Sequence, residues 1–206
     1  MNYRANKTPV DLRSHIISMG GIMDTGARNY LRYLEGDDDG IAEIVREYRE
    51  GLIFFLNGYV KNILTAEELT EDTFFKIMIK KPKFRDGASF KTWLYTIGKN
   101  TALDYIRKNS RHTRVGEEEL TNAALEQADF ERDLVRDEQR LIIHKAMDKL
   151  PPQYRQVLHL IFFEEFDNTE SAKILKKSKR QIEMLTYRAK KALKAQLEKE
   201  GFEYED

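Results

Sequence analysis

The sequence predicts an all-α protein built as two helical domains joined by an acidic, flexible linker. Three observations support this fold class. Apolar residues recur every three or four positions over most of the chain, no stretch shows the alternation of a half-buried strand, and only 4 prolines and 11 glycines interrupt the 206 residues. Hydrophobic residues make up 41% of the chain, which is enough to form packed cores.

Composition narrows the functional classes. The chain has no cysteine, which excludes disulfides and thiolate metal ligands, and its four histidines lack the spacing of a metal site. No apolar run reaches the roughly 18 residues of a membrane span. The N-terminus lacks the apolar core of a signal peptide. We therefore expect no metal, no cofactor, no membrane insertion and a cytoplasmic location.

Charge is balanced, with 35 basic and 35 acidic residues, but it is unevenly distributed. Basic residues dominate 76–114 and 173–199, whereas 35–50 and 117–138 are acidic. Two basic blocks separated by an acidic one indicate two polyanion-binding modules on a linker. The predicted division is a loose extension (1–28), a first domain (29–112), an acidic linker (113–138), a second domain (139–200) and an acidic tail (201–206).

Hydrophobic spacing places the helices within this division. Helical patterns cover 30–48, 52–64, 67–79, 90–107, 141–150 and 154–162. Pro82 ends the third of these, and a loop over 83–89 follows it. The residues before the first pattern are weakly patterned, and Met23 is a candidate for the natural start. Pro151 and Pro152 mark the turn between the last two patterns.

The predicted helix over 90–107 interleaves aromatic and basic side chains. With its flank it contains Phe90, Lys91, Trp93, Tyr95, Lys99, Tyr105, Arg107 and Lys108. Aromatic faces can stack on unpaired bases for about 1–3 kcal/mol each, while cations hold the phosphate backbone. This combination favours single-stranded nucleic acid. The alternative is that Phe90 and Trp93 are core anchors, as aromatic residues usually are.

The segment 167–197 predicts two helices joined by a short turn. Asp167 and Glu170 can form a capping box on the first helix, and Ser178 can cap the second. The buried stripe of the second helix is expected to be Ile182, Leu185, Ala189, Ala192 and Leu193. Its outer face is mostly basic, so the pattern is that of a helix-turn-helix, which binds duplex DNA. The alternative is an amphipathic hairpin whose charges are simply solvated.

Three motifs resemble the sigma factors of bacterial RNA polymerase. Their promoter-melting helix resembles SFKTWLYTIGKNTALDYIRK, and their polymerase-docking helix resembles TAEELTEDTF. Their C-terminal promoter-binding domain resembles LPPQYRQVLHLIFFEEFDNTESAKILKKSKRQIEMLTYRAKKAL. The motifs occur in the expected order over roughly residues 29–197, and only a short linker separates the two modules. This layout resembles the extracytoplasmic-function (ECF) group of the sigma-70 family.

The resemblance implies a transcription initiation factor that binds RNA polymerase core and directs it to promoters, with an anti-sigma factor as a further candidate partner. Promoter DNA would be bound as −35 duplex and as melted −10 strand. The implied docking residues are Glu68, Leu69, Asp72 and Phe75. The implied −10 residues are Arg85, Ser89, Phe90, Lys91, Trp93, Lys99 and Asn100. The implied −35 residues are Lys179, Arg180, Gln181, Glu183, Met184, Tyr187, Arg188 and Lys191.

Two positions depart from the family pattern. Glu183 and Leu185 stand where basic residues are common in the family. A carboxylate cannot pair with phosphate, although it can accept a hydrogen bond from a cytosine amino group. Leu185 belongs to the apolar stripe, so the corresponding basic contact is expected to be missing. These departures leave the −35 sequence open without changing the class.

Two other functions compete with this interpretation. A free-standing helix-turn-helix regulator would bind duplex DNA alone, but it would not need an aromatic–basic melting helix or a docking helix. An enzyme would depend on scattered carboxylates and on His144 or His159. The sequence has no phosphate-binding loop, nucleophile elbow or metal-ligand spacing, so we expect no catalytic residues.

Overall fold

The computed structural model describes residues 24–84, 88–112 and 138–199, and every regular element in these ranges is a helix. The predicted all-α class is confirmed. Most of the predicted extension, nearly all of the predicted linker and the predicted tail lie outside the described residues. Within the described part, no helix combines the length and the apolar character needed to cross a membrane.

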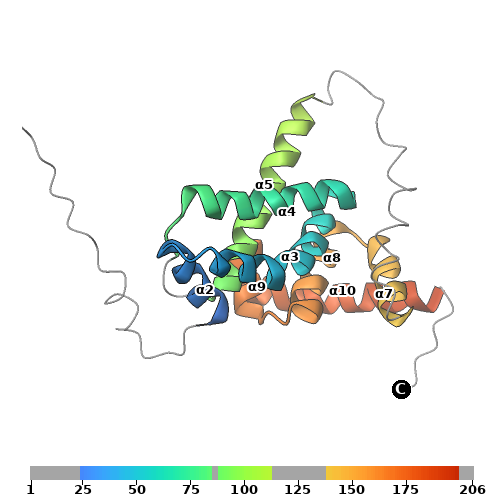
Figure 1. Ribbon diagram of the computed structural model, residues 1–206. Helices are drawn as coiled ribbons and strands as arrows, with labels where there is room; N and C mark the ends of the chain where they lie inside the picture. Colours follow the sequence, from blue (N-terminus) through green and yellow to red (C-terminus); the bar gives the residue numbers. More distant parts are fainter. Residues whose placement is uncertain (1–23, 85–87, 113–137, 200–206) are drawn as a thin grey trace, which may run out of the picture.

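The N-terminal helices are α2 (Thr25–Leu34), α3 (Asp39–Val60), α4 (Ile63–Lys80) and α5 (Phe90–His112) (Figure 1). The helical patterns expected over 30–48 and 52–64 do not correspond to two helices, because the helix boundaries fall at other positions. Gly36, with a φ of 100°, follows the end of α2. Lys61 takes a left-handed conformation and Asn62 caps α4, so the apolar run is split between α3 and α4. Local backbone geometry therefore overrides the hydrophobic pattern at both breaks.

An aromatic cluster fixes α2 against α5. The Tyr30 ring lies 5.6 Å from the Phe90 ring and 5.2 Å from the Trp93 ring, measured between centroids. The Tyr30 hydroxyl donates a hydrogen bond to the Pro82 carbonyl at 2.9 Å. Asp24 caps α2, and its second carboxylate oxygen accepts a hydrogen bond from the Phe90 N–H at 2.8 Å. Helix α5 is thus held firmly at its start, while its other end projects past α4 (Figure 1).

The C-terminal helices are α7 (Glu138–Asp148), α8 (Pro152–Leu158), the π-helical turn η2 (His159–Phe163), α9 (Asn168–Leu175) and α10 (Lys179–Lys199). The helix expected over 154–162 is therefore α8 continued by η2. Asp167 and Glu170 form the predicted capping box on α9. The Ser178 hydroxyl accepts a hydrogen bond from the Gln181 N–H at 3.2 Å, as predicted for the cap of α10. Helices α9 and α10 are the two helices of the expected helix-turn-helix.

The C-terminal helices pack directly on the N-terminal ones. Helix α8 and η2 lie against α3, and α9 lies against α5. One hydrophobic cluster contains fully buried side chains from both groups, including Leu52 and Phe55 on α3 and Val157 and Leu160 on α8 and η2. The described part of the chain therefore forms a closed arrangement in which the two groups of helices share a core.

Candidate nucleic-acid interfaces

Helix α10 exposes a basic and aromatic face. Its buried stripe follows the prediction, because Ile182 and Ala189 are fully buried and Leu185, Ala192 and Leu193 pack against the core. The opposite face is exposed: Tyr187 is 71% exposed and Met184 is 47% exposed. The remaining exposed members of the predicted −35 set are Lys179, Arg180, Gln181, Glu183, Arg188 and Lys191. The structure thus brings the whole predicted set onto one accessible helix.

Two contacts modify this face. The Gln181 side-chain oxygen accepts a hydrogen bond from the Ser178 N–H at 2.8 Å, so Gln181 takes part in capping α10. Next to the face, Phe162 is 49% exposed, and the Lys190 ammonium lies 4.7 Å from its ring centroid. A cation over an aromatic ring is stabilised by the ring quadrupole. Phe162 is not among the residues predicted from the sequence, because it lies in η2 and not in the recognition helix.

Helix α5 is packed on more than one side. Phe90 is fully buried, with its ring 5.9 Å from Tyr48 and 5.3 Å from Trp93. Phe90 is therefore a core anchor, and its assignment as a −10 contact is wrong. Trp93 and Asn100 are only partly buried. Arg85 lies outside the described residues.

Three other predicted −10 residues contact the C-terminal helices. The Ser89 hydroxyl donates to Glu170 Oε1 at 2.9 Å. The Lys91 ammonium lies 2.8 Å from the Glu164 carbonyl oxygen and 2.9 Å from its carboxylate. The Lys99 ammonium donates to the Ile174 carbonyl at 2.8 Å. The side chains that would hold phosphate are thus occupied by acceptors from the same chain.

The polar contacts around Glu164 form a buried cluster. Burial by itself would raise the pKa of the Glu164 carboxyl, but the hydrogen bond and charge of His159, with smaller effects of Tyr95 and Lys91, outweigh it and lower the pKa to about 2. His159 Nε2 lies 3.3 Å from Glu164 Oε1 and 3.0 Å from the Gly51 carbonyl oxygen. The cluster joins η2 to α3 and α5, and this contact explains the burial of His159.

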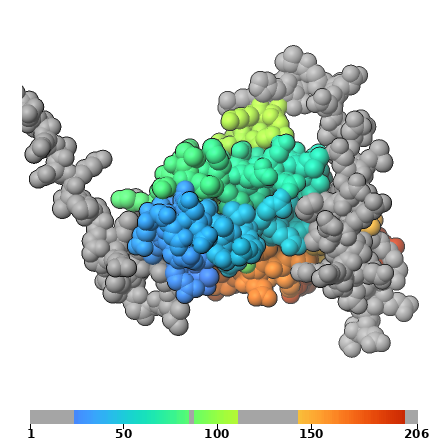
Figure 2. All heavy atoms as spheres, in the orientation of Figure 1, coloured from blue at the N-terminus to red at the C-terminus, as the bar shows by residue number. Residues whose placement is uncertain are grey.

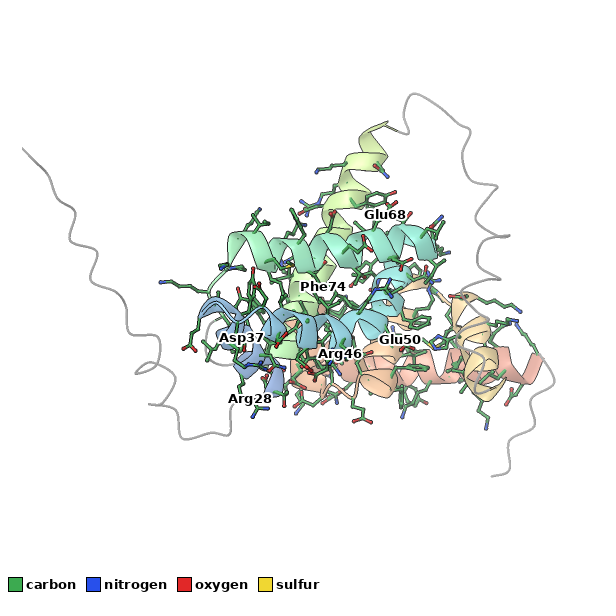
Figure 3. The ribbon with its side chains drawn as sticks, in the orientation of Figure 1. Arg28, Asp37, Arg46, Glu50, Glu68 and Phe74 are labelled. Carbon is green, nitrogen blue, oxygen red and sulfur yellow. The ribbon has the colours of Figure 1, made fainter. Side chains whose placement is uncertain are left out.

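Helix α4 carries an exposed apolar stripe among acidic side chains. Phe75 is 62% exposed, Ile79 is 66% exposed and Leu64 is 45% exposed. Glu68 and Asp72 are exposed on the same helix. Helix α4 lies on the outside of the molecule (Figure 2), and Figure 3 shows Glu68 on its outer side and Phe74 between α4 and α3.

One predicted docking residue is misplaced. Leu69 is 4% exposed and belongs to the core, so its assignment as a surface contact is wrong. Leu64 and Ile79 were missed, although with Phe75 they follow the helical intervals i, i+11 and i+15 and so share one face. That periodicity could have identified them. Thr70, Thr73, Phe74 and Ile77 form the buried side of α4, so apolar residues alone do not distinguish the two sides.

The described residues contain no group of three or more histidine or carboxylate side chains placed to bind a metal ion. The two histidines considered for catalysis are packed against aromatic rings. His144 lies 4.9 Å from the Phe54 ring and 4.8 Å from the Phe163 ring, and His159 lies 5.5 Å from the Phe163 ring. Both rings therefore contribute to the packing between helices.

Comparison with known proteins identifies the family. The model of sigma-70 region 2 matches residues 44–112, and the model of sigma-70 region 4 matches residues 140–193. The RNA polymerase sigma factor YlaC of Bacillus subtilis is 30% identical over 164 residues, which cover 78% of this chain and 94% of that protein. The ECF RNA polymerase sigma factor SigW of the same organism is 29% identical over 171 residues, which cover 79% of this chain and 91% of that protein.

Two solved structures share the fold. Sigma factor RpoE in complex with the anti-sigma factor NepR from Bartonella quintana aligns with a TM-score of 0.58 and 23% identity, covering 76% of this chain and 96% of that one. CnrH in complex with the cytosolic domain of CnrY aligns with a TM-score of 0.59 and 20% identity, covering 85% of this chain and 98% of that one.

The order of the two matched regions and the helical fold define an RNA polymerase sigma factor, which is a class of transcription initiation factors and not of catalysts. The chain belongs to the sigma-70 family, and within it to the ECF sigma factors. The prediction of a sigma factor is confirmed, and a free-standing regulator is not favoured.

Proposed function

We propose that three separate helical surfaces divide the work of this sigma factor. The outer face of α4 docks on core polymerase, α5 with the loop before it holds the melted −10 strand, and the exposed face of α10 reads the −35 duplex. The polymerase supplies the bond chemistry, and this chain acts by binding alone. Its place of action is the cytoplasm, where polymerase and promoter DNA meet.

The observation that carries this proposal is the exposed stripe of α4. Contiguous exposed apolar side chains mark interaction sites on a soluble protein. Phe75 and Ile79 lie one turn apart and are both more than half exposed, with Glu68 and Asp72 beside them. A regulator that binds DNA alone would not need an exposed apolar surface on a helix other than those of its helix-turn-helix. An aromatic anchor with a charged surround is typical of a protein-binding hot spot.

Substitution of Phe75 tests this docking surface. We expect Phe75→Ser to weaken binding to core polymerase by roughly 30-fold, as for loss of a hot-spot residue of about 2 kcal/mol. The matched control is Phe162→Ser, which removes an exposed phenylalanine from the C-terminal helices and should leave core binding unchanged. Affinity is measured by titrating labelled chain with core polymerase. Equal affinities of wild type and a folded Phe75→Ser variant would refute the docking role.

For the −35 element, we assign duplex reading to α10. Its exposed face presents Tyr187, Arg188 and Lys191 together, with Met184 for apolar contact with base edges. Glu183 is exposed on the same helix and can accept a hydrogen bond from a cytosine amino group in the major groove. This assignment is supported by the accessibility of the face in the closed arrangement.

For the −10 element, we assign strand binding to Ser89, Lys91, Trp93, Lys99 and Asn100. Trp93 and Asn100 lie seven positions apart on α5 and share a face, as two helical turns require. A partly buried tryptophan can stack on an extruded base, and an amide can hydrogen-bond its edge. Phe90 supports this surface from the core and does not contact the strand in this proposal.

An anti-sigma factor is a further partner that we propose for this chain. The support is the similarity in fold to RpoE, which was solved in complex with the anti-sigma factor NepR. The same helices would then be available either to that partner or to polymerase and promoter DNA.

A further inference from the structure

The contacts between α9 and α5 cover the surface to which we assigned the melted strand. Glu170 Oε1 accepts hydrogen bonds from the hydroxyls of Ser89 at 2.9 Å and Thr92 at 3.1 Å. One turn further along α9, the Ile174 carbonyl accepts from the Lys99 ammonium. Lys99 is only 6% exposed as a result. In this arrangement a phosphate backbone has no access to the Lys99 ammonium.

A second set of contacts holds η2 over the start of α5. The Lys91 ammonium is paired with the Glu164 carboxylate, and it also lies 5.0 Å from the Phe166 ring centroid. The Tyr95 ring packs edge-on against Phe166 at 5.1 Å. Polar groups that would bind the strand and apolar groups that support them are thus both covered by the C-terminal helices.

Glycines on α3 allow the C-terminal helices to approach this closely. A Cβ atom at Gly51 would overlap Glu164 Oε1. A Cβ atom at Gly58 would lie 3.6 Å from Gln156 Cγ, so alanine fits there in ordinary contact, whereas the ring system of a tryptophan would have to displace Gln156 of α8. The Arg155 guanidinium, itself 4% exposed, lies 3.4 Å from the Gly58 carbonyl oxygen. Gly51 and Gly58 lie two turns apart, so they form one narrow contact strip on α3.

The closed arrangement is incompatible with simultaneous reading of both promoter elements. Positions −35 and −10 are separated by roughly 85 Å of duplex at 3.4 Å per base pair. In the closed chain, α9 of the helix-turn-helix touches α5 directly. The connecting residues 113–137 would reach about 85 Å if fully extended, which is enough to let the two groups of helices separate.

From these observations we propose that the closed arrangement is a self-inhibited state, in which the α8–η2–α9 surface occupies the strand-binding face of α5 and must leave it before the −10 strand can bind. This inference rests on the proposed assignment of α5 to strand binding. The occupant is the C-terminal domain of the same chain, so inhibition requires no second protein. A melted −10 strand would favour the open form, because it would bind a face of α5 that only that form exposes.

The test is a matched pair of full-length variants at Gly58, a position outside the proposed DNA and polymerase surfaces. Gly58→Trp should separate the two groups of helices, and Gly58→Ala should stay closed. Small-angle scattering measures the opening as an increased radius of gyration. Binding is measured with a pool of fluorescein-labelled single-stranded DNA 12-mers of random sequence. We expect the tryptophan variant to bind at least about 10-fold more tightly than the wild type, because apparent affinity scales with the open fraction.

Three outcomes would overturn the proposal. A wild type as expanded as Gly58→Trp would mean that the closed form is not populated. An increased radius of gyration of Gly58→Trp without tighter DNA binding would mean that the closed arrangement does not cover a strand-binding surface. A gain in binding that survives Lys91→Ala in the Gly58→Trp background would place the strand on another surface, which would contradict the −10 assignment itself. A gain lost on Lys91→Ala supports both proposals.

A second pair of substitutions tests the same point if Gly58→Trp does not fold by circular dichroism. The chain has no cysteine, so Gly58→Cys with Gln156→Cys introduces one unambiguous disulfide. We expect the oxidised form to bind the 12-mer pool at least about 10-fold more weakly than the reduced form, which can still open, and reductant to restore the wild-type affinity. Failure of the disulfide to form under oxidation, or equal binding by oxidised and reduced protein, would overturn the proposal.

Discussion

Helices α5 and α10 are both predicted from sequence to contact nucleic acid, yet the structure packs them in opposite ways. Helix α10 buries one stripe and leaves the other side accessible, with Tyr187 71% exposed. Helix α5 lies between two layers: Phe90, Leu94 and Tyr95 are fully buried, and Lys99 is covered by α9. In a helix that packs on one side, the spacing of apolar residues separates the buried face from the exposed one. In a helix that packs on two sides, this spacing does not identify the functional face.

The difference also changes what a basic side chain can bind in each helix. On α10, Arg188 and Lys191 stand free for a polyanion in the closed chain. On α5, the ammonium groups of Lys91 and Lys99 already have acceptors. Duplex binding by α10 should therefore be available in the closed arrangement, while strand binding by α5 should require opening.

The largest expected effect contrasts one aromatic residue from each helix. Phe90→Ala removes a fully buried ring and should lower the free energy of unfolding by about 3–5 kcal/mol. Tyr187→Ala removes a mostly exposed ring and should change it by no more than about 0.5 kcal/mol. Urea denaturation followed by circular dichroism measures both. A loss below about 1 kcal/mol for Phe90→Ala would contradict its role as a core anchor.

Features encoded by neighbouring residues could be predicted from the sequence. The capping box of Asp167 and Glu170, the cap at Ser178 and the buried stripe of α10 follow from local hydrogen bonding and helical spacing, and all are confirmed. The breaks at Gly36 and Lys61 were misplaced, because a left-handed residue ends a helix without interrupting its apolar pattern.

Contacts between distant helices could not be predicted. Lys99 donates to a backbone carbonyl, and every residue has one, so no side chain marks the partner. Leu69 and Phe75 lie in one motif, but α4 is apolar on two sides, so spacing alone did not separate the buried residue from the exposed one. The partner of Lys99 and the burial of Leu69 both depend on which helices pack together, and the sequence alone does not show this.

A smaller effect is expected from Arg188→Ala on binding to duplex DNA. If Arg188 contacts phosphate, its removal should reduce the slope of log affinity against log salt by about one for a pool of 20-bp duplexes. If it contacts a base, the loss should be about 1–3 kcal/mol and confined to duplexes with one base at one position. The effect should be equal in the oxidised and reduced Gly58→Cys, Gln156→Cys protein. No change in slope, affinity or sequence preference would argue that α10 is not the reader.

The smallest expected effect is a pH dependence of closure through Lys99. Burial, and then the nearby charges of Lys176 and Lys177, lower the pKa of Lys99 to about 8 in the closed chain. Opening removes these causes, so the pKa returns toward the usual value of about 10.4. Below pH 8 the ammonium is charged in both forms, and the closed form bears the full cost of burying it. Between pH 8 and about 10 the closed form releases the proton first, so closure should become more favourable as the pH rises.

This dependence is best measured in a partly opened variant. Gly51→Ala crowds Glu164 and should loosen closure without removing any strand-binding residue. Its radius of gyration should decrease between pH 7 and 9.5, with the closed-to-open ratio rising by less than tenfold per pH unit, because only one proton is released. The buried Tyr95 hydroxyl, whose pKa is raised by burial, stays protonated in this window. Adding Lys99→Met should make the radius independent of pH, and a radius that still decreases would assign the effect to another group.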